Sequence, residues 1–282
     1  MATDSSRFSR NVALFGTAGQ ARIASSRVAI VGLGGLGSHV AQQLAYIGVP
    51  YIVLIDPDIV TTSSLNRLVG ANPSDADSSA DKVAVMERLC RQIRPECDIR
   101  ALTTKVSDVE SRLAVESCTS VFGCLDDDTA RLELIKLCAC NGLPLFDLAS
   151  DTGGTNDDHW YGGRVLFSGQ GDRCPSCMDL LDQTQLARAS MSDDAREVDR
   201  RIYGVKADDL DATGPAVVSI NGIVASLAVT EWMVWTTGLR DPAPLLEYRG
   251  RVGAVFVNRD LPQPDCYYCS LWNRNRDVPK AG

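Results

Sequence analysis

The chain has 282 residues, of which 45% are hydrophobic and 23% are charged. This composition is ordinary for a soluble globular protein, and the length allows one large α/β domain or two small ones. The net charge of −8 argues against nucleic acid or an anionic membrane surface as the main partner. The first ten residues lack the apolar core of a signal peptide, and no window appears long enough to span a membrane, so we expect a cytoplasmic protein.

Residues 1–26 predict a short helical arm that carries Arg7, Arg10 and Arg22. On its own, such an arm is typical of a solvated amphipathic segment.

The stretch 27–58 has the order of a nucleotide-binding βαβ unit. An apolar strand leads into a glycine-rich turn, a helix is expected over 38–48, and a second apolar strand over 51–55 ends at Asp56. The glycines let the backbone turn tightly and approach a phosphate, while the helix N-terminus adds N–H groups and positive dipole character. Asp56 is placed to accept hydrogen bonds from ribose hydroxyls. The pattern predicts a nucleotide site without naming the nucleotide; its glycines are Gly32, Gly34, Gly35 and Gly37.

A polar, irregular loop over 59–80 contains Asn66 and Arg67, and a helix is expected over 81–93. Lys82 falls in the first turn of this helix, where a positive charge is unfavourable for the helix dipole. It either faces a bound anion or is a solvated surface lysine.

The alternation of strands and helices continues to about residue 149. Strands are expected over 98–104, 120–125 and 143–149, and helices over 107–117 and 129–141. The strand 120–125 ends in three consecutive acids, Asp126, Asp127 and Asp128, at the sheet edge where ligands bind. One of them should cap the following helix, and the cluster can also hold magnesium against nucleotide phosphates.

Beyond residue 150 the alternation weakens. We expect a loop over 153–156, a strand over 163–167 and a polar crossover segment over 179–213, where specificity for a partner would reside. A long apolar helix over 215–237 must be buried or lie in a subunit interface. A last strand is expected over 251–257.

Four of the ten cysteines form two pairs with a two-residue gap, a spacing that lets both thiolates of a pair reach one tetrahedral metal. With four thiolates and no open position, the metal should be structural zinc. The alternative is two unrelated loops that happen to carry cysteines. The proposed ligands are Cys174, Cys177, Cys266 and Cys269.

In joint order and spacing, these motifs resemble the ThiF/MoeB/HesA group, the bacterial relatives of ubiquitin-activating enzymes, over most of residues 7–270. The matching segments are Arg7–Arg10, the glycine turn 32–38, the acidic strand end Asp56–Asp58, the loop Ser63–Arg67, the helix-start Lys82, the segment Cys124–Asp126 and the two cysteine pairs.

The resemblance implies a single α/β domain over 1–282, with a Rossmann-like, mostly parallel sheet and helices on both faces. Residues 1–26 would be its arm, 27–150 its nucleotide-binding half and 151–282 its zinc-tied, carrier-binding half. It also implies a homodimer, which we expect to form through the long apolar helix.

The implied activity is the use of ATP and Mg²⁺ to adenylate a C-terminal carboxylate, commonly the Gly-Gly end of a ubiquitin-like or sulfur-carrier protein, or of a peptide. Arg67 and Lys82 would hold phosphates, Asp126 would bind magnesium, and Arg10 would reach the partner's site. The implied nucleotide-binding set is Gly32, Gly34, Gly35, Gly37, Asp56, Asp58, Ser64, Asn66, Arg67, Lys82, Asp126 and Asp127.

Three departures from the family pattern stand out. The first is in the loop, where Ser64 replaces a usual Asn and Leu68 a frequent Gln, and the second is Asp127, which replaces a common Asn. The third is that no cysteine lies between Cys177 and Cys266 to take an acyl group as a thioester. We therefore expect an adenylating enzyme without its own thioester. The six remaining cysteines are expected to be buried apolar thiols: Cys90, Cys97, Cys118, Cys124, Cys138 and Cys140.

Two other functions fit parts of the sequence. An NAD-dependent oxidoreductase would need a base, and the only histidines are His39, beside the glycine turn, and His159, in a polar loop. A non-catalytic subunit that binds a carrier but not ATP would normally lack the phosphate-binding residues that are present here.

Overall fold

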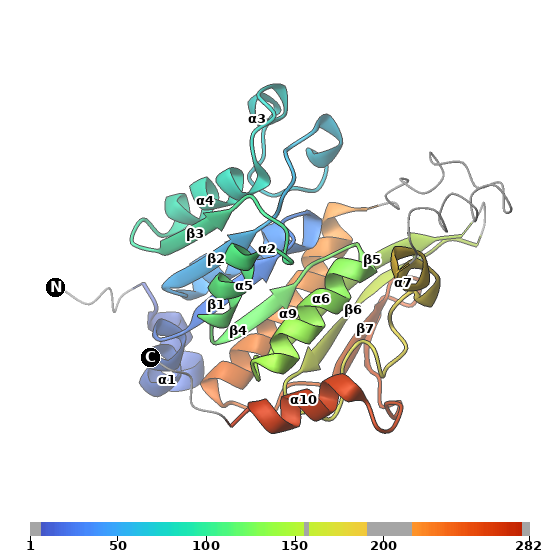
Figure 1. Ribbon diagram of the computed structural model, residues 1–282. Coiled ribbons are helices and arrows are strands. Elements are labelled where there is room, and N and C mark those ends of the chain that lie inside the picture. The colour runs from blue at the N-terminus through green and yellow to red at the C-terminus, as the bar shows by residue number, and fades with distance from the viewer. Residues whose placement is uncertain (1–6, 155–157, 191–215, 278–282) are drawn as a thin grey trace, which may run out of the picture.

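The computed structural model describes residues 7–154, 158–190 and 216–277. Its central element is one eight-stranded sheet in the order β3-β2-β1-β4-β5-β6-β7-β8, with helices on both sides (Figure 1). The strands are β1 Arg27–Val31, β2 Tyr51–Ile55, β3 Asp98–Leu102, β4 Ser120–Gly123, β5 Leu145–Gly153, β6 Trp160–Ser168, β7 Leu245–Arg249 and β8 Ala254–Val257.

The sheet has a parallel and an antiparallel part. Strands β3, β2, β1, β4 and β5 pair in parallel, whereas β6, β7 and β8 add to β5 in antiparallel fashion. The expected α/β class with a mostly parallel sheet is confirmed, and its parallel part is formed by the strands within residues 27–153. Strand β7 was missed, because a five-residue segment preceded by Pro242 and Pro244 has little strand pattern of its own.

The helices are α1 Ser9–Ala24, α2 Gly35–Ile47, η1 Thr62–Ser64, α3 Pro73–Asp77, α4 Lys82–Ile93, α5 Val109–Glu116, α6 Asp128–Cys140, α7 Gln183–Ser190, α9 Val218–Thr237 and α10 Tyr267–Asn275. The sequence predicted α1 within the arm 1–26, and it predicted α2, α4, α5, α6 and α9 with ends that differ by a few residues. It did not predict η1, α3, α7 or α10. The crossover segment expected over 179–213 includes α7, and its part from 191 on lies outside the described residues.

The central strands are buried on both faces. In β1, Val28 and Ile30 belong to the apolar cluster beneath α2, α4 and α9, while Ala29 and Val31 belong to the cluster beneath α5, α6 and α10. A strand covered by helices on both sides has no solvent-facing position. This explains its nearly unbroken apolar sequence.

Helix α9 lies against α1, α2, β5 and β6, and Trp232 in it is fully buried. By length and composition alone, this 20-residue helix could cross a membrane, so our sequence-based statement that no window reaches that length is wrong. Half of its most apolar window is buried inside the protein. The same composition is found in the core helices of soluble proteins.

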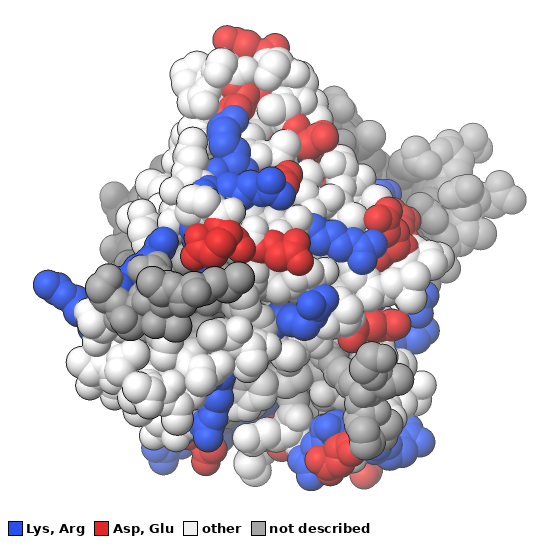
Figure 2. Space-filling model, turned by 90° about the vertical axis from the view of Figure 1, so that its left-hand side faces the viewer, with Lys and Arg blue, Asp and Glu red and all other residues white. Residues whose placement is uncertain are grey.

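The N-terminal arm begins at the end of the molecule opposite the glycine turn. The ring of Phe8 packs on Gly48 after the C-terminus of α2, and Arg7 Nη2 donates a 2.5 Å hydrogen bond to the carbonyl of Ile93 at the end of α4. Gly16, with φ of 72°, interrupts α1. On the face shown in Figure 2, acidic and basic side chains alternate without forming a continuous basic surface.

Candidate functional site

The glycine turn between β1 and α2 is so tightly packed that side chains are excluded from it. Gly32 has φ of +88°, and a Cβ there would lie 2.5 Å from the carbonyl oxygen of Cys124. A Cβ at Gly37 would overlap the carbonyl oxygen of Gly32. At Gly34, by contrast, no atom of the described residues outside its chain neighbours lies within 4 Å of such an atom. The turn is therefore closed toward β4 and open at Gly34, where α2 begins and its free N–H groups can meet an anion.

Asp56 ties this turn to the end of β2. Its Oδ2 accepts a 2.6 Å hydrogen bond from the N–H of Leu33, and its Oδ1 accepts one of 2.9 Å from the N–H of Asp58. Burial raises the pKa of this carboxyl group, against the opposing effect of Lys82. The sequence predicted only a ribose-binding role for Asp56, whereas the structure also gives it a part in shaping the turn.

Lys82 stands beside these carboxylates. Its Nζ lies 2.7 Å from Asp58 Oδ2 and 3.7 Å from Asp56 Oδ1, and its side chain is 15% exposed. The interpretation of Lys82 as a freely solvated surface residue is therefore wrong. The ammonium group lies at the carboxyl end of the sheet, next to the glycine turn.

The loop 59–80 brings Arg67 to the same place. The Cβ of Arg67 lies 3.5 Å from the position that a Cβ on Gly35 would take, and its guanidinium donates to the carbonyl of Ser63 and to the Oδ1 of Asn66. Ser64 is buried, and its hydroxyl forms a capping box with Thr61 at η1. The hydroxyl group of Ser64, which stands where the family usually has Asn, thus helps to shape the loop.

The three acids after β4 have different surroundings. Asp126 is exposed, and Asp127 caps α6 by accepting a 2.8 Å hydrogen bond from the N–H of Ala130, as expected for one of the three. Asp128 is buried and pairs with Arg131. The close approach of Gly32 to Cys124 sets this acidic loop beside the glycine turn. An exposed carboxylate there is the kind of oxygen ligand that Mg²⁺ prefers.

Asn221, in the first turn of α9, was missed by the sequence analysis. It is 2% exposed, and its side-chain amide occupies the space that a Cβ on Gly35 would need. The hydroxyl of Ser150 donates a 2.6 Å hydrogen bond to its Oδ1, which directs its Nδ2 toward the glycine turn. The one sequence feature that could have indicated this role was an amide side chain in a largely apolar helix.

The structure does not place Arg10 near the other predicted site residues. It is exposed on α1, whose start packs at the C-terminal end of α2. The glycine turn lies at the other end of this 13-residue helix, roughly 20 Å away at 1.5 Å per residue.

The four paired cysteines meet in one cluster, which joins the segment after β6 to α10. All four sulfur atoms lie within 4.8 Å of one another. The Sγ distances are 3.6 Å for Cys174–Cys266, 3.7 Å for Cys177–Cys269 and 3.8 Å for Cys174–Cys177. A tetrahedral zinc with bonds of about 2.3 Å requires sulfurs about 3.8 Å apart, so this donor set fits zinc. Hydrogen bonding from Cys174 lowers the pKa of Cys177.

Of the six other cysteines, five are buried as expected. Burial raises the pKa of Cys90 to about 12 and that of Cys97 to about 11, which makes both poor nucleophiles. Cys140 is exposed at the end of α6, so the expectation of burial is wrong there. His39 packs against Gly222 of α9, and burial lowers its pKa. His159 is exposed in a separate part of the chain.

A family model described as "ThiF family" matches residues 8–273. The chain belongs to the ThiF family. Among its curated relatives, this ThiF-family chain is 32% identical over 146 residues to the SAMP-activating enzyme E1 of Haloferax volcanii, an alignment that covers 51% of the chain and 53% of that protein. It is 34% identical over 165 residues to the sulfur carrier protein ThiS adenylyltransferase of Escherichia coli, covering 58% and 62%. The matched segments thus span between half and two thirds of these relatives.

The fold is also that of a solved ThiF-like structure. The crystal structure of E. coli MccB with ATP superposes with a TM-score of 0.69 at 18% identity, covering 93% of this chain and 74% of MccB. At this identity the likeness concerns the fold alone.

Proposed function

We propose that this protein is an ATP-dependent adenylyltransferase that activates a C-terminal carboxylate as an acyl-adenylate. One observation carries the proposal: the glycine turn, Arg67, Lys82 and the acidic loop of Asp126 converge at one edge of the sheet. Membership of the ThiF family and the adenylyltransferases among its relatives support it.

In this reaction a carboxylate oxygen forms a bond to the α-phosphorus of ATP, and the bond from that phosphorus to the pyrophosphate oxygen breaks. The carboxylate is a weak nucleophile that the triphosphate repels, so the site must neutralise charge and align the reacting atoms. Arg67, Lys82 and the N–H groups of α2 would hold the phosphates, and Asp56 or Asp58 would bind the ribose. Asp126 would hold Mg²⁺, which neutralises the phosphates when bound.

The ammonium group of Lys82 is paired with the carboxylate of Asp58. Since Asp58 has a largely exposed side chain, we propose that Lys82 moves from this partner to a phosphate when ATP binds. The exchange keeps the ammonium group paired at every stage.

We propose that the acyl acceptor is not a cysteine of this chain. No cysteine occurs between Cys177 and Cys266, and burial raises the pKa values of Cys90 and Cys97. The acyl-adenylate would then pass to an external nucleophile. The substrate would be a ubiquitin-like or sulfur-carrier protein with a Gly-Gly end, or a peptide.

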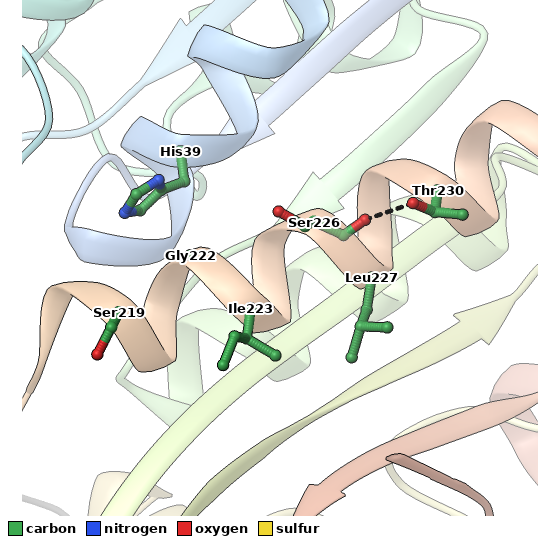
Figure 3. Close-up of a pocket in the computed structure, with 7 residues that line it drawn as sticks. All are labelled: His39, Ser219, Gly222, Ile223, Ser226, Leu227 and Thr230. Atoms are coloured by element: carbon green, nitrogen blue, oxygen red, sulfur yellow. Dashed lines mark hydrogen bonds between the residues drawn. The ribbon is translucent and has the colours of Figure 1, made fainter. Parts of the chain in front are cut away.

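We further propose that the protein is a homodimer that forms through α9. A shallow groove of about 530 Å³ runs along this helix between His39 of α2 and residues of α9, including Ile223 and Leu227 (Figure 3). Helix α1 packs against α9, and we propose that the same contact between copies brings Arg10 to the partner's site. Because Arg10 lies far from the glycine turn of its own chain, it would act on the partner's ATP.

The test is ATP–pyrophosphate exchange with Mg²⁺ and a panel of Gly-Gly-ended carriers and peptides, with Asp126→Ala as the inactive control. Exchange that requires one substrate and disappears in the variant supports adenylation and identifies the substrate. ATP binding without exchange on any substrate would favour the non-catalytic subunit instead. Absence of ATP binding would refute the proposal that the protein is an ATP-dependent adenylyltransferase.

A further inference from the structure

A buried ion network lies directly behind the acidic loop. Arg131 of α6, with a side chain 7% exposed, donates to the carbonyl oxygen of Leu125 and to the carboxylate of Asp128. Leu125 precedes Asp126 in the chain, and Asp128 is the second residue after it. Arg131 therefore holds the backbone carbonyl before Asp126 and the side chain of Asp128 after it.

The network continues into the sheet and is balanced in charge. Nε of Arg131 lies 3.0 Å from Asp147 Oδ1 of β5, an ion pair without hydrogen-bond geometry. Asp147 also pairs at 2.6 Å with Arg164 of β6, which in turn donates to the carbonyl of Leu180. Two arginines thus face two carboxylates, so removal of one member leaves a buried charge without its partner.

Asp128 also fastens the start of α7. Its Oδ2 accepts a 2.7 Å hydrogen bond from the N–H of Asp182, and its own N–H donates one of 3.0 Å to Oε1 of Gln185. The first turn of α7, more than 50 residues along the chain, is therefore bonded to the residue that begins α6. These contacts complete a path from α7 to the backbone around Asp126.

We propose that Asp128 and Arg131 are positioning residues for adenylyl transfer, which fix the carboxylate of Asp126 toward the magnesium–phosphate group and make its position depend on α7. The inference rests on the proposed function. Both residues are buried, so their effect would come through the placement of Asp126. A displacement of about 1 Å at a reacting group can cost on the order of 100-fold in rate.

The experiment compares Asp128→Asn and Gln185→Ala with a matched control, Glu231→Gln. Glu231 is also a buried carboxylate, held at 2.7 Å by both guanidinium nitrogens of Arg240, but it belongs to the distal half of α9. Substrate-dependent ATP–pyrophosphate exchange is measured over a range of ATP and Mg²⁺ concentrations. We expect Asp128→Asn to lower kcat on the order of 100-fold with the KM for ATP changed less than about three-fold.

Glu231→Gln should keep kcat within about two-fold of wild type, even if its melting temperature falls as much as that of Asp128→Asn. Gln185→Ala removes one hydrogen bond from a half-buried side chain and should fold normally. Its kcat should fall by about three- to ten-fold. Arg131→Lys keeps the charge but loses the forked geometry of the guanidinium, so its kcat should lie between those of wild type and Asp128→Asn.

Hydrogen exchange followed by mass spectrometry supplies a readout that does not need activity. Amides of 124–128 and 182–187 should exchange faster in Asp128→Asn and, to a smaller extent, in Gln185→Ala. They should be unchanged in Glu231→Gln.

The proposal is overturned if the loss of kcat in Asp128→Asn is no larger than in Glu231→Gln, or if only the KM for ATP rises. It is also overturned if hydrogen exchange near Asp126 stays at the wild-type rate in Asp128→Asn. A wild-type protein without any pyrophosphate exchange would refute the proposed function instead. Hydrogen exchange would then still decide whether Asp128 holds the acidic loop.

Discussion

The side-chain amide of Asn221 fills the space beside Gly35 that any larger residue would need, with Asn221 Cγ only 2.9 Å from the position of a Cβ there. The contact joins the start of α9 to the start of α2, at the turn expected to hold phosphate. Ser150 holds the amide in place, so it cannot move aside without losing a hydrogen bond of 2.6 Å.

Gly35→Ala should therefore destabilise the protein by about 1–3 kcal/mol, the usual cost of forcing extra volume into a packed site. It should also weaken ATP binding, because the turn must shift. Gly34→Ala is the control, since its Cβ meets nothing within 4 Å, and its unfolding free energy should stay within about 0.5 kcal/mol of wild type. Denaturant unfolding and calorimetric ATP titration measure the two effects. Equal stability of the two variants would contradict the packing argument.

Asp75 gives the stability of the loop 59–80 a pH dependence. Both carboxylate oxygens of Asp75 accept 2.7 Å hydrogen bonds from Arg88, which also donates to the carbonyl of Gly70. These bonds lower the pKa of Asp75. Because the pKa is lower in the folded state than the unfolded value of about 3.9, the stabilisation is complete above that value and is lost as the pH falls through the lowered pKa.

Asp75→Asn should thus be less stable than wild type near neutral pH, and the gap in melting temperature should narrow below about pH 4. The exposed Asp77 on the same helix provides the control, and Asp77→Asn should keep the wild-type melting temperature near neutral pH. Thermal melts from pH 7 down to about pH 2 measure this. A gap that is constant across the range would show that Asp75 does not contribute through its charge.

The cysteine cluster predicts one zinc ion per chain. Removing it with a chelator, or by Cys177→Ala, should destabilise the second half of the chain, because structural zinc supplies free energy of folding that reaches on the order of 10 kcal/mol in small zinc domains. Cys140→Ala, at the exposed cysteine of α6, should keep both the metal and the melting temperature. Elemental analysis and thermal melts test this. Metal-free wild-type protein that melts at the same temperature as the zinc-loaded protein would contradict it.

Arg10 and Asp126 should complement each other between subunits if Arg10 acts in trans. Arg10→Ala and Asp126→Ala should each be inactive as homodimers. In a mixed dimer, one of the two sites would combine an intact Asp126 with an intact Arg10 from the partner. Random mixing should restore about a quarter of wild-type activity, since half of the dimers are mixed and each has one working site. No recovery after verified subunit exchange would argue that Arg10 does not act in trans.

The sequence alone determined the features that depend on local pattern. The order of strand, glycine turn, helix and Asp56 predicted the βαβ unit because strand and helix periods and turn residues are properties of neighbouring positions. The spacing within each cysteine pair predicted a metal site for the same reason. A helix cap among the three acids after β4 was likewise readable from the start of α6, whereas the place of Lys82 at the start of α4 left a bound anion and a solvated surface both open.

Tertiary structure decided the contacts between residues far apart in the chain. Asn221 meets Gly35 only because α9 packs across α2, and Leu33 bonds to Asp56 only because β1 and β2 are adjacent in the sheet. The network around Arg131 depends on the pairing of β5 with β6, and β7 is a strand because β6 offers it an edge. No local pattern encodes these relations, because each arises from two segments that become neighbours only when the sheet and its helices assemble.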